Sequence, residues 1–139
     1  MTYCIQDLAP GMSESFTKTV SERDVMLFGE VSGDTNPVHF DEAFAKATMF
    51  KGRIVHGALS ASYISTVLGM KMPGPGTIFL SLTTRFKGPV RIGDTVTATC
   101  TVREVMTAGR RVLFDCVCKV KDTVVVEGEA LVKAPNKAR

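Results

Sequence analysis

IVHGALSASYISTVLGM, residues 54–70, is the longest stretch of the chain without a charged side chain, apart from His56. Its apolar residues are interrupted by Ser60, Ser62, Ser65 and Thr66, and it falls short of the roughly 20 apolar residues that span a membrane. We therefore expect a buried helix and no membrane partner. The sequence MPGPG at residues 72–76 should end this helix.

The chain after the helix has the pattern of β-strands. Four apolar or alternating segments are separated by turn residues: 77–86, Thr95–Met106, 110–121 and Thr123–Lys133. The first should place four apolar side chains on one face: Ile78, Leu80, Leu82 and Phe86. Short turns between strands predict an antiparallel sheet with one face covered. The expected fold class is therefore α+β, an antiparallel β-sheet wrapped around a long central helix.

Before the long helix, the chain predicts a short strand at residues 14–20 and two short helices. Ser21 and Asp24 have the spacing of a capping box, and apolar residues follow at helical spacing. The cluster SGDTNP at residues 32–37 should end that helix, and Asp41 should cap a second one over residues 41–48. No repeat or linker interrupts the pattern, so residues 1–139 are expected to form a single domain.

Charge and cysteine content exclude several classes of function. The chain has 17 Lys and Arg against 14 Asp and Glu, a net charge of +3, and its basic residues are scattered, so no nucleic-acid partner is expected. The four cysteines form no CxxC pair and the chain has two histidines, so no metal site is expected. Unpaired thiols without a signal peptide predict a cytoplasmic protein.

Asp34 and His39 are the candidate catalytic pair. They lie five residues apart across a loop in which Gly33 permits a sharp turn and Pro37 fixes φ. A carboxylate and an imidazole around one water molecule can remove one proton and deliver another. The alternative is an ordinary helix-exit loop, in which Asp34 makes an Asx turn and His39 is merely packed.

The sequence around this pair resembles the hydratase signature of the MaoC-like (R)-specific enoyl-CoA hydratases, a family with the hot-dog fold. Three segments carry the resemblance, in order along the chain: Phe28 to Ala45, which includes VSGD at 31–34 and NPVH at 36–39; IVHG at 54–57; and FKGPV at 86–90 followed by Gly93 and Asp94. The first segment is specific for the hydratases, whereas the other two occur throughout hot-dog proteins. Together they span essentially the whole chain.

The resemblance places Asp34 and His39 on the family's catalytic pair and Gly57 on the glycine that starts the central helix. A helix N-terminus has free N–H groups, so Gly57 could stabilise the enolate oxygen of a thioester; the alternative is close packing of helix and sheet. Three further residues are candidates for substrate binding: Asn36, Ser62 and Ser65. His56 is expected to be a structural histidine with its hydrogen bonds satisfied.

The function that the resemblance implies is reversible hydration of trans-2-enoyl-CoA to (R)-3-hydroxyacyl-CoA, without a metal or redox cofactor. The alternatives are a 3-hydroxyacyl-[acyl-carrier-protein] dehydratase, an acyl-CoA thioesterase on the same fold, and a non-catalytic acyl-CoA-binding module. The resemblance also implies a homodimer that shares its ligand tunnel. Five basic residues are candidate contacts for CoA phosphates: Lys51, Arg53, Arg85, Lys87 and Arg91.

Overall fold

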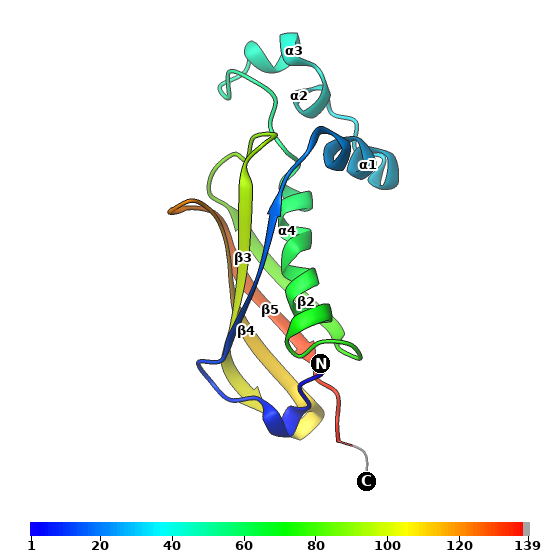
Figure 1. The fold of residues 1–139 in the computed structure, drawn as a ribbon, viewed down its shortest axis with the longest axis vertical. Coiled ribbons are helices and arrows are strands. Elements are labelled where there is room, and N and C mark those ends of the chain that lie inside the picture. Colours follow the sequence, from blue (N-terminus) through cyan, green and yellow to red (C-terminus); the bar gives the residue numbers. More distant parts are fainter. Residues whose placement is uncertain (138–139) are drawn as a thin grey trace.

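The structure, a computed structural model, describes residues 1–137. Its elements, in chain order, are the 3-10 turn η1 (Ile5–Asp7), β1 (Ser13–Thr19), α1 (Glu22–Ser32), α2 (Pro37–Phe40), α3 (Glu42–Lys46), α4 (Gly57–Thr66), the π-helical turn η2 (Val67–Lys71), β2 (Ile78–Phe86), β3 (Thr95–Met106), the 3-10 turn η3 (Ala108–Arg110), β4 (Arg111–Val120) and β5 (Thr123–Lys133). Figure 1 shows α4 lying along one face of the sheet, with α1, α2 and α3 gathered beyond one end of it.

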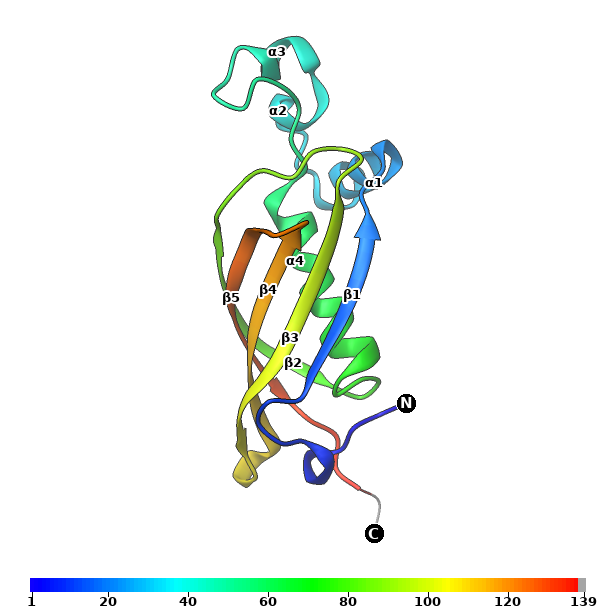
Figure 2. The ribbon, with the colours of Figure 1, turned by 60° about the vertical axis from the view of Figure 1, so that its left-hand side comes forward.

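The five strands form one antiparallel sheet in the order β1-β3-β4-β5-β2. Consecutive strands β3, β4 and β5 are neighbours, as short turns require, and the edges are β1 and β2. The sheet curves around α4, which Figure 2 shows from the side. The predicted α+β architecture, a sheet wrapped around a central helix, is confirmed.

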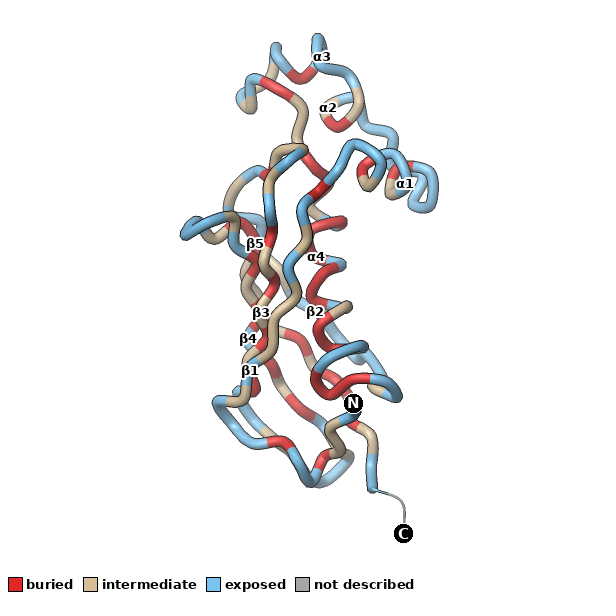
Figure 3. Tube along the Cα trace, viewed as in Figure 1, coloured by how far each residue is buried: buried red, intermediate tan, exposed pale blue. Residues whose placement is uncertain are grey.

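The core lies between α4 and the concave face of the sheet. Alternate residues of β3 and β4 are buried: Val96, Ala98, Cys100, Val102, Val112, Phe114, Cys116 and Cys118. The central helix contributes Ile64, Val67 and Leu68, which are at most 1% exposed. In Figure 3 the sheet side of α4 is buried and its opposite side is exposed. Burial of each of these three aliphatic side chains of the helix stabilises the fold by about 1.5–3 kcal/mol, and together they fix the position of α4.

The helix predicted near residues 54–70 begins three residues later, at Gly57, and its last turn is π-helical. Ile54 and Val55 lie outside the helix, and their N–H groups bind other segments: Ile54 N donates to Val38 O (3.3 Å) and Val55 N to Val90 O (2.7 Å). Within residues 1–137, no helix has the length and apolar character needed to cross a membrane.

The N-terminal half follows the predicted signals closely. The capping box of α1 is present: Asp24 N donates to Ser21 Oγ (3.1 Å), and Ser21 N donates to the Asp24 carboxylate (3.0 Å). Gly33 ends α1 with a left-handed φ of 79°, and Asp41 caps α3, which is shorter than predicted. The helical turn α2 was not predicted; it begins at Pro37 with Asn36 as its cap.

The prediction of which β2 side chains share one face is wrong in part. The pairing with β5 shifts register between Phe79 and Ser81, so a bulge at Leu80 interrupts the alternation. Phe79, rather than Ile78, now lies opposite a buried residue of β5, on the side shared by Leu82 and Phe86. Local alternation cannot reveal a bulge, because the extra residue is defined by the partner strand.

Candidate functional site

Asp34 is held just after α1 by hydrogen bonds of its own loop. Ser32 Oγ donates to Phe28 O (2.6 Å) and accepts from Asp34 N (3.1 Å), which ties the loop to the last turn of α1. Asp34 Oδ1 accepts from Asn36 N (3.2 Å), the Asx turn that the helix-exit alternative predicted. Asp34 is exposed, so its carboxylate is both fixed by the turn and accessible.

His39 lies on α2, where the backbone contacts of its ring decide which nitrogen is basic. Asn36 Oδ1 accepts from Val38 N (3.2 Å) and so caps the turn, with Pro37 in its first position. His39 is 8% exposed, and its Nδ1 lies 2.8 Å from Ile54 O. A carbonyl oxygen only accepts, so Nδ1 carries the proton and Nε2 keeps its lone pair.

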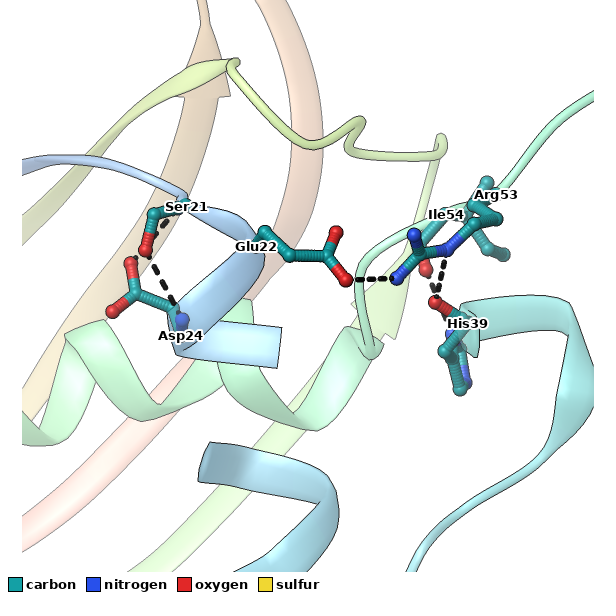
Figure 4. A network of polar contacts seen from close by, with 6 residues as sticks. All are labelled: Ser21, Glu22, Asp24, His39, Arg53 and Ile54. Carbon is teal, nitrogen blue, oxygen red and sulfur yellow. Dashed lines mark hydrogen bonds and ion pairs between the residues drawn. The ribbon is translucent and has the colours of Figure 1, made fainter. Parts of the chain in front are cut away.

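Arg53 connects α1, α2 and the segment before α4. Its Nε donates to His39 O (2.7 Å), and its guanidinium forms an ion pair with Glu22 (3.0 Å), as Figure 4 shows. Predicted as a contact for CoA phosphates, this side chain instead bonds within the protein. The bridge fixes the backbone of His39 relative to α1.

The surroundings of His39 lower its pKa. Burial is the main cause, and the neighbouring His56 acts in the same direction, whereas the hydrogen bond to Ile54 O and the Asp34 carboxylate oppose it. The imidazole is therefore neutral near pH 7 and offers Nε2 as a proton acceptor.

Asp34, His39 and His56 converge. One potential ligand atom from each lies within 4.8 Å of the others, and this is the one such group of three within residues 1–137. One nitrogen of each ring already bonds to a backbone carbonyl, His39 to Ile54 and His56 to Asp34. These three side chains could hold a cation, but the arrangement also suits acid–base chemistry on one bound water.

His56 differs from the prediction. It is buried, but Nδ1 has no hydrogen-bond partner within residues 1–137, so the histidine is not satisfied as expected. Its ring stacks on that of His39, with centroids 3.9 Å apart and an interplanar angle of 28°. The sequence placed His56 next to a buried helix but gave no sign of a contact with His39.

A cavity of about 560 Å³ lies at the N-terminal end of α4, with mainly apolar walls. Gly57 and Ser60 line it from the helix, and Phe86 and Val90 from the sheet side. Asp34 and His39 are not part of its wall, but Ile54 is, and the carbonyl of Ile54 accepts the hydrogen bond from His39. His39 therefore adjoins the cavity through Ile54.

Gly57 is the first residue of α4, as the resemblance implied. Within the described residues, its N–H and that of Ala58 donate no hydrogen bond, as expected in the first turn of a helix. A Cβ at position 57 would lie 2.8 Å from the ring of Phe86. Gly57 therefore combines an N–H without a partner among the described residues, at the wall of the cavity, with close packing of helix and sheet, so both readings of this glycine have support.

The serines of α4 divide between two faces. Ser62 and Ser65 are exposed and do not line the cavity of this protomer; Ser62 Oγ donates to Leu59 O (2.5 Å) instead. Ser60 lines the cavity, is 1% exposed, and its Oγ has no partner within residues 1–137. Sequence reasoning missed Ser60 as a cavity residue, although its spacing of three from Gly57 puts both on one helix face.

Of the other basic candidates, Arg91 donates to the carbonyl oxygens of Gly52 (3.1 Å) and Phe50 (2.5 Å), so it too serves the protein itself. Lys87 lines the cavity and forms an exposed ion pair with Glu127 (3.7 Å). Arg85 lies in a separate hollow on the sheet, and Lys51 is exposed. Lys87 is thus the basic candidate that the structure places at the cavity.

Comparisons with known proteins point to one family. A family model described as the MaoC-like domain matches residues 8–127. An (R)-specific enoyl-CoA hydratase of Rhodospirillum rubrum is 51% identical over 130 residues, covering 94% of this chain and 90% of the relative. A 3-hydroxybutyryl-CoA dehydratase of Methylorubrum extorquens is 47% identical over 132 residues, covering 95% and 84%. The unliganded R-hydratase PhaJ1 of Pseudomonas aeruginosa superposes with a TM-score of 0.92 at 40% identity, covering 98% and 88%.

Proposed function

The chain belongs to the family of MaoC-like domains and has their hot-dog fold, and we propose on that basis that it is an (R)-specific enoyl-CoA hydratase. It would add water to trans-2-enoyl-CoA and give (R)-3-hydroxyacyl-CoA, reversibly. One similar relative is named a hydratase and another a dehydratase, names that describe the two directions of this reaction.

The observation that carries the proposal is the convergence of the Asp34 carboxylate with the ring of His39. Both are proton acceptors, because Nδ1 of His39 is committed to Ile54 O and Nε2 keeps its lone pair. A water molecule has two O–H groups and can donate one to each acceptor. Its oxygen lone pair is then directed at the substrate.

Hydration follows from this arrangement. The water oxygen bonds to Cβ of the enoyl group while one of the pair takes a proton from it, and the electrons of the double bond move toward the thioester carbonyl. The N–H of Gly57 stabilises the enolate oxygen that forms. The pair then returns a proton to Cα, so that H and OH are added and nothing else is consumed. Because water and proton both come from the Asp34–His39 side, the addition is syn.

The other substrate-binding candidates have different parts in this proposal. Asn36 has a positioning part: its backbone N–H donates to the Asp34 carboxylate and closes the turn, and its Oδ1 caps α2. Ser62 and Ser65 face outward, so they can contact the acyl chain only if a second copy of the chain closes over that side of α4. Acyl length and the choice of CoA or acyl carrier protein depend on contacts beyond this pair.

An assay with crotonyl-CoA tests the function. Absorbance of the enoyl group and free thiol are followed in parallel, and the product is analysed on a chiral column. Loss of the enoyl signal without thiol release, with (R)-3-hydroxybutyryl-CoA as product, is the expected result. Thiol release would instead identify a thioesterase. Faster turnover of the same acyl group on acyl carrier protein would identify the carrier-protein dehydratase.

We also propose that two copies of the chain form the working enzyme. The edge strand β2 exposes apolar side chains that a monomer would leave in water: Ile78, Phe79, Leu80, Leu82 and Phe86, each 39–57% exposed. An unpaired edge of this kind is ordinarily covered or paired, and a two-fold axis would make the contact self-complementary. The segment 41–52 could cover this edge within one chain instead, but its helix α3 lies beyond the end of the sheet (Figure 1).

Light scattering tests the dimer, because one chain has a mass of 15.0 kDa. We expect about twice that mass at micromolar concentration, and a fully active species with the mass of one chain would refute the proposal. A cytoplasmic location and a single domain over residues 1–139 stay predictions; the four free cysteines support the first.

A further inference from the structure

The side chain of His56 is buried among three other rings, next to the catalytic candidates. It is 1% exposed and stacks on His39, and two phenylalanines complete its surroundings. The ring centroid of Phe28 lies 4.9 Å away and that of Phe40 5.5 Å away. Three elements, α1, α2 and the start of α4, therefore meet at this one imidazole.

The hydrogen bonds of His56 determine where its proton sits. Nε2 lies 2.9 Å from Asp34 O, and a carbonyl oxygen only accepts, so Nε2 carries the proton. Nδ1 is buried, and no partner for it is found in residues 1–137. His56 is thus a hydrogen-bond donor to the backbone of Asp34.

We propose that His56 is a positioning residue for the Asp34–His39 pair, holding the Asp34 backbone with its Nε2–H and the His39 ring with its own ring. This inference rests on the proposed hydratase function. His56 directly precedes Gly57, so one short segment sets both the Asp34 carbonyl and the N–H for the thioester oxygen. The distance between the bound water and the substrate carbonyl is thereby fixed.

The charged and titratable groups around His39 are few, which makes the effect of His56 measurable. Asp34 faces it from the loop after α1 and His56 from the start of α4. Arg53, paired with Glu22 of α1, reaches the His39 carbonyl rather than the ring. Of these, His56 alone stacks on the face of the imidazole, so its ring keeps bulk solvent from that face and leaves the ring edge for the bound water.

Nitrogen NMR of the unsubstituted protein tests the geometry without any assay. The chain has two histidines, so 15N-labelled histidine gives signals from two imidazoles. We expect opposite neutral tautomers at pH 7.5, with the proton on Nδ1 of His39 and on Nε2 of His56. The same tautomer in both rings, or a doubly protonated His56 at that pH, would overturn the proposal.

Two substitutions separate the two contacts. His56→Phe keeps a ring against His39 but removes the N–H, so kcat with crotonyl-CoA should fall about 10- to 100-fold with little change in KM. His56→Gln keeps an N–H within reach of Asp34 O but removes the ring. Its kcat should lie between those of His56→Phe and the original protein. The acid limb of its pH profile should move to higher pH, because solvent reaches the face of His39 and its pKa rises.

Gly69→Ala, a change in η2 with no atom within 4 Å of the added Cβ, is the matched control and should keep the original kcat and pH profile. The opposite result is that both His56 variants give less folded protein while kcat per folded molecule and the pH profile stay unchanged. In that case His56 has only a structural role and the proposal is wrong. If the unsubstituted protein does not hydrate crotonyl-CoA but gives the expected tautomers, the proposed function fails while the geometry of His56 stands.

Discussion

Replacing Gly29 by alanine should destabilise the protein, although the same change stabilises most helices. Gly29 is buried in α1, and a Cβ there would lie 2.4 Å from Cζ of Phe40 and 3.2–3.3 Å from the two neighbouring ring atoms. Carbon atoms ordinarily approach to about 3.5–4.0 Å, so the ring would have to retreat by more than about 1 Å. It would retreat among His39 and His56, whose rings it meets edge to face.

The expected loss of stability in Gly29→Ala is the balance of two opposing effects. Alanine in a helix gains about 1 kcal/mol over glycine, whereas overpacking of this kind costs about 1–3 kcal/mol. The expected net loss is about 1 kcal/mol, or roughly 3–4 °C in Tm for a chain of this size. At Gly69, where an added Cβ has open space, alanine should raise Tm instead. The two substitutions should therefore shift Tm in opposite directions.

Thermal unfolding at equal protein concentration measures both shifts, and kcat with crotonyl-CoA measures the effect on the site. We expect kcat of Gly29→Ala to fall about tenfold, because Phe40 supports the rings of His39 and His56. Phe40→Leu removes the ring tip, so in the Gly29→Ala background it should cost less than in the original protein. A rise in Tm for Gly29→Ala, similar to that for Gly69→Ala, would refute the packing argument.

The other predictions concern the catalytic groups directly. Asp34→Asn and His39→Gln should each lower kcat by roughly 10²–10⁴, and the double variant should be little worse than either; a single variant with near-original activity would exclude that residue as catalytic. Gly57→Val should lower turnover about 10²-fold by keeping the thioester oxygen from the N–H. Adding Phe86→Leu relieves its contact with the ring, so recovered activity would assign Gly57 to packing alone. Finally, kcat/KM should fall with decreasing pH through the lowered pKa of His39, so the acid limb should lie below pH 6.5; a limb above 6.5 would contradict a buried neutral base.

Much of the fold could be predicted because its signals are local. The capping box at Ser21 and the strand limits of β3 and β5 are each encoded by residues close in sequence. The bulge in β2 was missed because it depends on the register with β5, a strand more than 40 residues away. The late start of α4 was missed for the same reason, since Val55 N donates to Val90 O, 35 residues away in the chain.

The same distinction between local signals and distant contacts applies to the candidate site. Asp34 and His39 could be found because Gly33 and Pro37 shape their loop locally, and a known signature surrounds them. The contact of His56 with His39 was not predictable, because ring stacking between residues 17 positions apart depends on the packing of α2 against α4. Ser62 and Ser65 lie on the exposed side of α4, whereas helical spacing from Gly57 selects Ser60.

The contacts that hold the catalytic pair leave its chemistry free. His39 is fixed through Nδ1 and its backbone carbonyl, so Nε2 remains available. Asp34 is fixed through its backbone N–H, its carbonyl and one carboxylate oxygen, so the second oxygen remains available. Neither side chain forms an ion pair within residues 1–137, so no charged partner stands between these atoms and a bound water. The backbone carbonyls and rings that position the pair therefore do so without consuming the two atoms that the reaction needs.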